Sequence, residues 1–345
     1  MAILSTDALT LKFGGLTAVN GVSLAVHRGE IFSIIGPNGA GKTSLFNAVS
    51  GVYTPTSGAI LIEDMNSCRR ISAALIFGLM ASGLLTAFGF LLIFHIAALW
   101  HAVITARFVF RQSFDWLGAL EAIGHYAREQ PLQTLIFPML LGATTGTLGA
   151  LSVWRGSRRS PEVCASFGLS RTFQNVRLFP QLSATENILI GMHRRLSSNF
   201  WSSLLHLPGM KRQEKTSKAK AHELLAFVEL EESAERAAGS LPYGYQRRLE
   251  IARALASDPK VLLLDEPAAG MNPTESVQLM QLITRIKERG ITVVLIEHDM
   301  KVVMGISDRI AVLDYGNLIA EGTPAEVRCN PLVIEAYLGT GAHSE

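Results

Sequence analysis

Residues 36–43 contain the sequence feature that restricts this chain most. They are Gly-Pro-Asn-Gly-Ala-Gly-Lys-Thr, which fits the pattern G-x-x-x-x-G-K-[ST], and they follow the apolar run Ile-Phe-Ser-Ile-Ile at 31–35. Glycines in such a loop let successive backbone N–H groups turn towards phosphate oxygens. The pattern predicts a strand, a phosphate-binding loop and a helix in that order, and hence an α/β fold.

The loop also predicts which residues hold a nucleotide and its metal ion. We expect the ammonium group of Lys42 to lie on the β- and γ-phosphates and the hydroxyl of Thr43 to coordinate Mg²⁺. An ordinary glycine turn is the alternative, and the strand and helix patterns on either side disfavour it. The predicted nucleotide-binding residues of this segment are Gly36, Pro37, Asn38, Gly39, Ala40, Gly41, Lys42, Thr43 and Ser44.

Two further apolar runs end in polar side chains of the kind that hydrolysis needs. The run 261–264 is followed by Asp265, expected to hold the Mg²⁺ shell, and by Glu266, expected to accept a proton from an attacking water. A solvated turn is the alternative for such a pair. His298 follows the run 291–296, so we expect it at the same edge of the sheet, where it would contact the γ-phosphate. A structural role is the alternative, because a lone histidine is more often structural.

Local patterns predict the elements around these motifs. Apolar runs at 9–13, 22–26 and 59–63 predict strands, and residues 211–230 have helical spacing. Helix starts with capping patterns are predicted at Ser183, Asn272 and Thr323, each followed three residues later by a glutamate. The sequence therefore predicts mixed α/β structure on both sides of the segment described next.

Two long segments without Asp, Glu, Lys or Arg interrupt this pattern. They are residues 71–106 and 131–154, and each is longer than the roughly 20 apolar residues that a helix needs to cross a bilayer. Small residues at four-residue spacing predict close helix packing, and they are Ala74, Gly78, Ser82, Thr86, Gly142 and Gly146. We expect a transmembrane helical hairpin with its 107–131 loop on the far side.

Arginines flank the apolar segments on both sides. Arg69 and Arg70 precede the first, and Arg155, Arg158 and Arg159 follow the second, so the positive-inside rule places both ends in the cytoplasm. Two alternatives stay open: a hydrophobic hairpin that packs on a partner protein or lies at the membrane interface, and an insertion without a function.

Charge and cysteine content exclude some classes of protein. The net charge of +2 and the pI near 8.4 give no basic surface strong enough to predict a nucleic-acid partner. Cys68, Cys164 and Cys329 are far apart and form no metal-ligand pattern, so neither a zinc site nor a disulfide framework is expected. A reducing cytosol fits this usage.

Five motifs in order resemble those of an ABC-transporter nucleotide-binding subunit. They are the phosphate loop 36–43, the Q-loop 171–174, the signature 241–253, the Walker B acids 265–266 with Pro267, and the H-loop His298. The resemblance covers the chain except about residues 67–158. Four segments resemble, more specifically, the ATPases of branched-chain amino acid importers. They are residues 168–175, 266–273, 297–300 and 330–339.

This resemblance implies the fold and its divisions. The implied fold is a P-loop NTPase ABC ATPase domain with a RecA-like core, an antiparallel β-subdomain and an α-helical subdomain, interrupted by the helical membrane hairpin. The implied parts are the N-terminal core with the phosphate loop at 1–66, the insertion at 67–158, the Q-loop segment at 159–182, the helical subdomain with the signature at 183–258, and the C-terminal core at 259–345.

The resemblance also implies a head-to-tail dimer of identical or different subunits, with each ATP between one phosphate loop and the partner's signature. Phe13 would stack on adenine, a strand-core role being the alternative, and backbone N–H groups of Tyr243 and Gly244 would bind phosphate. Pro242 stands where the family often has serine. The implied catalytic residues are Glu266, His298 and Gln174, and the implied metal ligands are Thr43, Gln174 and Asp265.

The implied function is ATP hydrolysis that drives uptake of branched-chain or other hydrophobic amino acids through separate membrane permease subunits. A periplasmic or extracellular substrate-binding protein would act indirectly. The alternative is a regulatory or membrane-tethering ABC ATPase without a role in amino acid uptake. The expected location is the cytoplasmic face of the cell membrane, integral if 71–106 and 131–154 span it and contact lipid.

Overall fold

The computed structural model describes residues 2–63, 65–66, 73–105, 116–129, 131–157, 160–193 and 208–338. The chain divides into two compact units. Unit 1 comprises Met1–Cys68 together with Arg159–Glu345, and unit 2 comprises Arg69–Arg158. Each unit has its own packing and is described by itself.

A six-stranded sheet forms the centre of unit 1, with strand order β10-β9-β3-β8-β7-β6. Its strands run parallel except for β10, which pairs antiparallel with β9. The strands are β3 (Ile31–Ile35), β6 (Leu169–Arg171), β7 (Val261–Asp265), β8 (Thr292–Ile296), β9 (Arg309–Asp314) and β10 (Asn317–Gly322). Because parallel strands share one carboxyl edge, the loops after β3, β7 and β8 meet there.

Both faces of this sheet are covered by apolar side chains. On β7, Leu262 and Leu264 pack into one hydrophobic cluster, whereas Val261 and Leu263 pack into another. All five residues of β3, of β7 and of β8 are buried. Continuous apolar runs are what strands need when both faces are covered, so the runs predicted at 31–35, 261–264 and 291–296 are confirmed as strands.

A second, antiparallel sheet of unit 1 has the order β2-β1-β4-β5. It comprises β1 (Ala2–Phe13), β2 (Leu16–His27), β4 (Ser57–Ile62) and β5 (Met65–Asn66). The predicted strands 9–13 and 22–26 were too short. The pairing of β1 with β2 has register shifts, and at such irregularities a strand can continue without alternating apolar and polar residues. The hydropathy pattern therefore did not predict the first half of β1.

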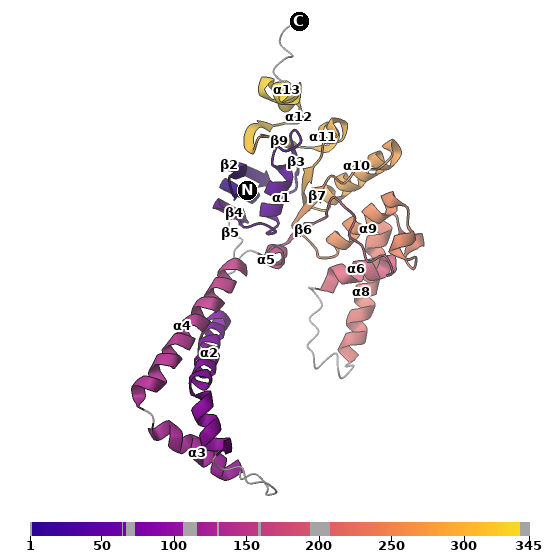
Figure 1. Cartoon of the computed structure of the whole chain (residues 1–345). Helices are drawn as coiled ribbons and strands as arrows, with labels where there is room; N and C mark the ends of the chain where they lie inside the picture. The colour runs from indigo at the N-terminus through magenta and orange to yellow at the C-terminus, as the bar shows by residue number, and fades with distance from the viewer. Residues whose placement is uncertain are drawn as a thin grey trace. The chain divides into compact units, whose positions relative to one another are not determined.

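Helices complete unit 1, and α6, α8 and α9 pack together (Figure 1). The capping boxes predicted at Ser183, Asn272 and Thr323 are confirmed, because each side chain accepts from the backbone of a glutamate three residues on. Among the described residues of unit 1, the helices are α1 (Lys42–Val49), α5 (Pro161–Ser166), α6 (Ala184–Met192), α8 (Pro208–Phe227), α9 (Tyr243–Leu255), α10 (Pro273–Glu288), α11 (Met300–Ile306), α12 (Pro324–Arg328) and α13 (Pro331–Leu338), with short 3₁₀ turns η3 (Glu231–Ser233) and η4 (Ala238–Ser240).

Unit 2 is helical in its described residues except Pro131. It contains α2 (Ala73–Trp100), the π-helical turn η1 (His101–Thr105), α3 (Trp116–Glu129) and α4 (Leu132–Ser157). The loop predicted over 107–131 is therefore wrong for 116–129. Residues Trp116, Ala119 and Ile123 have helical spacing, and Ala119 is buried, so this segment folds as a helix against its neighbours.

Small residues bring α2 and α4 into contact within unit 2. The Thr86 hydroxyl donates to the carbonyl oxygen of Gly142 at 2.7 Å, and a Cβ atom added to Gly146 would lie 1.9 Å from Thr86 Oγ1 and 2.8 Å from the carbonyl oxygen of Ser82. The predicted close packing is confirmed at these residues. Gly78 takes no part, because a Cβ there would meet nothing within 4 Å.

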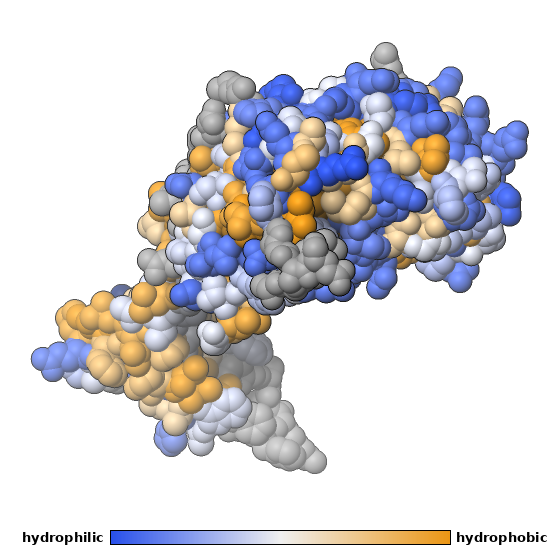
Figure 2. Space-filling view, turned by 90° about the horizontal axis from the view of Figure 1, so that it is seen from above, coloured by the Kyte–Doolittle hydropathy of each residue, from blue (hydrophilic) through white to orange (hydrophobic). Residues whose placement is uncertain are grey.

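The surface of unit 2 is strongly apolar. Leu75–Ala98 and Leu132–Trp154 have the length and composition of membrane-crossing helices, and only 11% of the window in each is buried. Figure 2 shows apolar surface gathered on the insertion, whereas hydrophilic surface predominates elsewhere. The predicted flanking residues Arg69, Arg70, Arg158 and Arg159 lie outside the described residues, as does Cys68.

Candidate functional site

The phosphate loop connects β3 to α1 with a backbone that only glycine tolerates at two positions. Gly36 has φ of 151° and Gly41 has φ of 95°. A Cβ atom would lie 2.1 Å from the carbonyl oxygen of Leu313 at the first position and 2.3 Å from that of Ala18 at the second. Gly41 is also the N-cap of α1 and carries no side chain to cap it, so the first N–H groups of α1 stay available for an anion.

Lys42 is held inside this loop. Its Nζ atom donates to the carbonyl oxygens of Gly36 at 2.7 Å and Pro37 at 2.9 Å, and the residue is only 8% exposed. Burial lowers the pKa of Lys42, while the charges of Glu266 and Asp265 act in the opposite direction. The structure therefore places this ammonium group within the electrostatic reach of both acids at the end of β7, Asp265 and Glu266.

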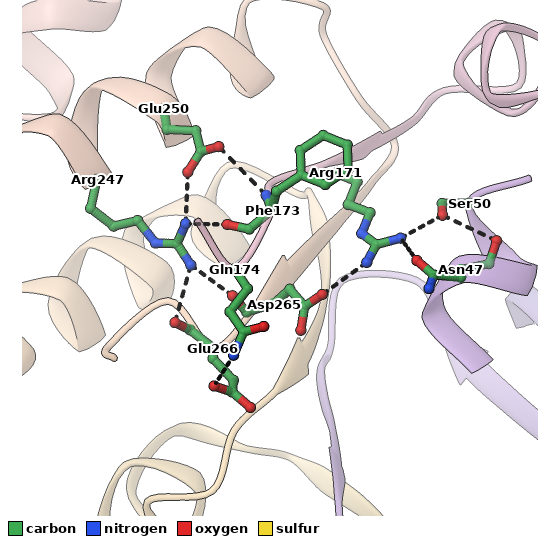
Figure 3. Close-up of polar contacts among 9 residues, drawn as sticks. All are labelled: Asn47, Ser50, Arg171, Phe173, Gln174, Arg247, Glu250, Asp265 and Glu266. Carbon is green, nitrogen blue, oxygen red and sulfur yellow. Dashed lines mark hydrogen bonds and ion pairs between the residues drawn. The ribbon is translucent and has the colours of Figure 1, made fainter. Parts of the chain in front are cut away.

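Asp265 ends β7 in a buried position and pairs with a cation from the Q-loop strand. The Asp265 Oδ2 atom lies 2.8 Å from Arg171 Nη2, with the two side chains 5% and 8% exposed. The other terminal nitrogen of Arg171 donates to Asn47 Oδ1 at 2.6 Å and to Ser50 Oγ at 2.8 Å (Figure 3). Arg171 thus ties the end of β7 to α1.

Glu266 follows in the left-handed region of backbone conformation, with φ of 43°. Such a conformation is unfavourable for a residue with a Cβ atom, and residues held in it are often part of active sites. Its N–H donates to the carbonyl oxygen of Ile296 at 2.9 Å, and its Oε2 accepts from Gln174 Nε2 at 2.9 Å. His298 Nδ1 lies 3.8 Å from the same oxygen. The structure therefore brings together Gln174, Glu266 and His298.

A second buried carboxylate supports the H-loop. Glu297 is 1% exposed, and burial raises its pKa. Its two oxygens accept from the backbone N–H of Ala268 at 2.9 Å and of His298 at 3.2 Å. Glu297 thereby joins the loop after β8 to the loop after β7.

Phe13 lies at the end of β1 with its ring 5.1 Å from that of Tyr53, edge to face. The two residues are 42% and 39% exposed, which contradicts the alternative that Phe13 is a core residue. Exposed aromatic faces of this kind suit a planar base.

The signature residues Tyr243 and Gly244 open α9, and Pro242 is its N-cap without a side-chain hydrogen bond. They come from the helical part of unit 1, whereas the phosphate loop comes from the sheet. Gly244 is closely packed, since a Cβ there would lie 2.8 Å from Glu275 Oε1.

Sequence reasoning gave no role to four charged residues that shape the site. They are Arg171, Arg247, Glu250 and Glu297. Each stands inside a motif that the sequence analysis identified, next to residues with expected roles. The sequence signal for these residues was the presence of a charged side chain within a motif. Only their burial in the fold distinguishes them from solvated surface charges.

A phosphate loop between a parallel strand and a helix, with acids at the end of a nearby strand of the same sheet, defines a P-loop nucleotide-binding domain. Comparisons with known proteins give the family. A model described as ABC transporter matches residues 19–76 and 134–269. A model described as branched-chain amino acid ATP-binding cassette transporter matches residues 317–343. The ABC transporter model does not match residues 77–133, which make up most of unit 2.

Relatives and solved structures agree with this family. The chain is 38% identical to the high-affinity branched-chain amino acid transport ATP-binding protein BraF of Pseudomonas aeruginosa, and 36% identical to LivG of Escherichia coli. Each alignment covers 98% of both chains. A solved structure of the ADP conformation of MJ1267, an ATP-binding cassette of an ABC transporter, has a TM-score of 0.61 and 25% identity, covering 98% of this chain and 99% of that one.

The chain belongs to the ABC transporter ATP-binding proteins, in the branched-chain amino acid transport group. It is an ABC ATPase, and the family expected from its motifs is confirmed.

Proposed function

We propose that this chain is the ATP-hydrolysing subunit of an importer for branched-chain or other hydrophobic amino acids. The observation that carries the proposal is the meeting of Gln174, Glu266 and His298, with the charges of Glu266 and Asp265 acting on Lys42. The substrate class rests on the names of BraF and LivG and on the match of the tail, residues 317–343. Permease subunits, and a substrate-binding protein indirectly, are the proposed partners at the cytoplasmic face of the membrane.

The residues of the site fit ATP and Mg²⁺. The Thr43 hydroxyl, the Asp265 carboxylate and the Gln174 amide supply the oxygen donors that Mg²⁺ prefers, and the glycine backbone of the phosphate loop supplies N–H donors. When bound, Mg²⁺ neutralises charge on the phosphates. Lys42 adds a positive point charge inside the loop.

Glu266 is the proposed general base. Its carboxylate accepts the proton of the attacking water, and the strained backbone at this residue directs it away from the strand. Gln174 donates to the carboxylate at 2.9 Å, and His298, the proposed γ-phosphate contact, has its Nδ1 atom 3.8 Å from the same oxygen. The approach of both side chains to one oxygen of Glu266 supports one catalytic unit.

A second subunit completes each site in this proposal. The first turn of α9, with backbone N–H groups of Tyr243 and Gly244, faces the nucleotide of a partner ATPase subunit. Phe13, packed edge to face on Tyr53, stacks on adenine. Pro242 lacks both a hydroxyl and an N–H, so this chain offers its partner two donors fewer than a serine would.

Substitution of the base tests the proposed function. Glu266→Gln in the full chain is expected to bind ATP normally and to lose most of its turnover in a single-turnover assay, because the phosphate loop is intact. Lys42→Ala is expected to lose tight nucleotide binding in a fluorescence titration. Hydrolysis at the normal rate by Glu266→Gln would remove the base assignment and leave the binding site standing.

Unit 2 is proposed to be a transmembrane helical hairpin. Support comes from the length and composition of α2 and α4, their small-residue contact at Thr86 and Gly142, and their apolar exposed surface. The unmatched residues 77–133 fit an addition to the ATPase. Expressed without a permease, the full chain is then expected to stay with the membrane during alkaline carbonate extraction.

Cysteine labelling decides between a spanning hairpin and one packed on a partner. Glu121 is exposed on α3 and Glu288 is exposed at the end of α10. With the three native cysteines replaced by serine, an impermeant thiol reagent on intact cells is expected to label Glu121→Cys and to spare Glu288→Cys until lysis. Labelling of both positions only after lysis, with carbonate release of the chain, supports the partner-packed alternative.

A regulatory or membrane-tethering ABC ATPase is the second candidate. Unit 2 alone favours it, since a membrane anchor within the ATPase chain would hold the chain at the bilayer without a permease. Uptake of leucine, isoleucine and valine by cells that lack this chain separates the two functions. Unchanged uptake, with hydrolysis intact, supports the tethering role.

A further inference from the structure

Arg247 has the largest fully buried side chain among the described residues of the chain. From α9, its guanidinium group donates to the carbonyl oxygen of Phe173 in the Q-loop. It also donates to the carbonyl oxygens of three consecutive residues at the end of β7 and beyond, which are Asp265 at 2.7 Å, Glu266 at 3.1 Å and Pro267 at 3.3 Å. One cation therefore joins three separate segments of the site (Figure 3).

Glu250, one turn further along α9, binds the same cation and the same loop. Its Oε2 atom lies 2.7 Å from Nη1 of Arg247, and its Oε1 atom accepts from the backbone N–H of Phe173 at 3.5 Å and of Arg177 at 3.3 Å. Both side chains are buried, at 0% and 1% exposure. Burial of an ion pair is costly unless its hydrogen bonds are complete, so this geometry depends on the Q-loop and the end of β7 being in place.

The main chain at Glu266 explains why an arginine is needed. The left-handed turn at this residue directs three successive carbonyl oxygens towards α9, and buried carbonyls need donors. A guanidinium group offers five N–H donors in a rigid plane, whereas an ammonium group is a compact point charge. Arg247 can therefore fix the direction in which the Glu266 side chain leaves the strand.

We propose that Arg247, held by Glu250, is a positioning residue that couples the two composite ATP sites of the dimer. The inference rests on the proposed function, in which Glu266 is the base and the first turn of α9 faces the partner's nucleotide. Arg247 lies four residues after Tyr243 on that helix. A phosphate that fixes the first turn of α9 therefore also fixes the main chain of Glu266 and, through Phe173, the Gln174 that contacts its carboxylate.

Arg247→Lys in the full chain, reconstituted in lipid, tests the role. The lysine keeps a charge facing Glu250 but cannot reach carbonyls on both sides. We expect kcat for ATP to fall about 100-fold, as displacement of a catalytic group by about 1 Å does. The KM for ATP should stay within about threefold, because the phosphate loop is unchanged. The Hill coefficient for ATP should fall towards one, because the sites are no longer coupled.

Arg248→Lys is the matched control. Arg248 is the next residue on α9, is 7% exposed, and pairs with Glu229 at 3.1 Å and with Gln278, so it has neither the Q-loop nor the end of β7 as a partner. The substitution removes a guanidinium group from the same helix, where its partner Glu229 is 59% exposed. Its kcat and Hill coefficient are expected to stay at the unsubstituted values.

A double variant separates positioning from loss of packing. If Arg247 acts through Glu266, adding Arg247→Lys to Glu266→Gln lowers single-turnover hydrolysis by less than about threefold further, because residues that act as a unit are not additive. A second loss of about 100-fold would show a merely structural role and overturn the inference. If Arg247→Lys does not fold, Glu250→Gln takes its place, with the same expected losses of kcat and of cooperativity.

The outcomes also separate the inference from the proposed function. Unchanged kcat and cooperativity in Arg247→Lys, with Glu266→Gln inactive, overturn the coupling role and leave the base assignment standing. Normal hydrolysis by Glu266→Gln removes the base, and the inference falls with it. A loss of kcat and cooperativity in Arg247→Lys, absent in Arg248→Lys, supports the inference.

Discussion

Replacement of Arg171 by methionine is the perturbation whose cost follows most directly from the structure. Arg171→Met keeps an unbranched apolar stem but removes the partner of Asp265 and the donors to Asn47 and Ser50. The Asp265 carboxylate, only 5% exposed, is left without its cation. We therefore expect the free energy of unfolding of unit 1 to fall strongly.

The magnitude follows from burial. Breaking a buried ion pair by removing one partner typically costs about 3–5 kcal/mol, because the remaining charge is uncompensated. An exposed pair contributes about 0–1 kcal/mol. Arg28 and Glu63 supply that comparison in the same unit, with N–O separation of 2.6 Å and side chains 64% and 25% exposed. Arg28→Met is thus the control, and we expect it to cost less than about 1 kcal/mol.

Hydrogen exchange is the suitable assay, because tryptophan fluorescence does not report on the described part of unit 1. Trp100, Trp116 and Trp154 lie in unit 2, and Trp201 lies outside the described residues. The slowest amides of β7 and β8 report global opening of unit 1. Without nucleotide, Arg171→Met should accelerate them by about 10²- to 10⁴-fold, which corresponds to 3–5 kcal/mol.

A double-mutant cycle checks the cause. Adding Asp265→Asn to Arg171→Met removes the uncompensated charge, so part of the lost protection should return. The reasoning is refuted if Arg171→Met exchanges no faster than Arg28→Met. Asp265 would then be compensated by groups other than Arg171, and the pair would contribute no more than an exposed one.

Three further predictions concern separate features. Pro242→Ser restores a hydroxyl donor worth on the order of 1 kcal/mol, so ATP-dependent dimerisation, measured by sedimentation, should rise; a decrease would mean that the proline shapes the loop. Burial raises the pKa of Glu297, so its contribution to stability is fully present below its ordinary pKa of 4.5 and is lost as pH rises through the raised value. Glu297→Gln should flatten that pH dependence in denaturant titrations, and an unchanged slope would contradict the assignment. In unit 2, Gly146→Ala places a Cβ 1.9 Å from Thr86 Oγ1 and should lower the thermal stability of the helix pair, whereas Gly149→Ala, with open space, should not; equal effects would exclude the close contact.

The parts of the fold that follow local rules could be predicted from the sequence. The phosphate loop, the buried parallel strands and the helix starts at Ser183, Asn272 and Thr323 depend on residues within a few positions of one another. The length of β1 could not, because irregular antiparallel pairing with β2 depends on a partner strand. Helix α3 was not predicted because residues 107–131 were expected to form a loop, and the helical spacing of Trp116, Ala119 and Ile123 was not used.

The candidate site divides in the same way. Lys42, Asp265 and Glu266 could be predicted from the sequence because their own side chains are proposed to act on the nucleotide. Only a few residue types can perform such roles. Gln174 and His298 could be assigned through the resemblance, and their contacts with Glu266 come from the folded chain. Tyr53, the ring beside Phe13, had no sequence signal because an exposed aromatic residue after a helix has many causes.

Arg247 shows why support for a site is harder to predict than the site itself. Apart from Glu250, its acceptors are main-chain carbonyl oxygens of Phe173, Asp265, Glu266 and Pro267, which any residue type would supply. The sequence therefore gives no indication that these carbonyl oxygens accept hydrogen bonds from Arg247. On the donor side, an arginine followed three residues later by a glutamate is typical of an exposed helix pair. The difference is that α9 is covered here by the Q-loop and by the left-handed turn after β7, and only the fold determines that burial.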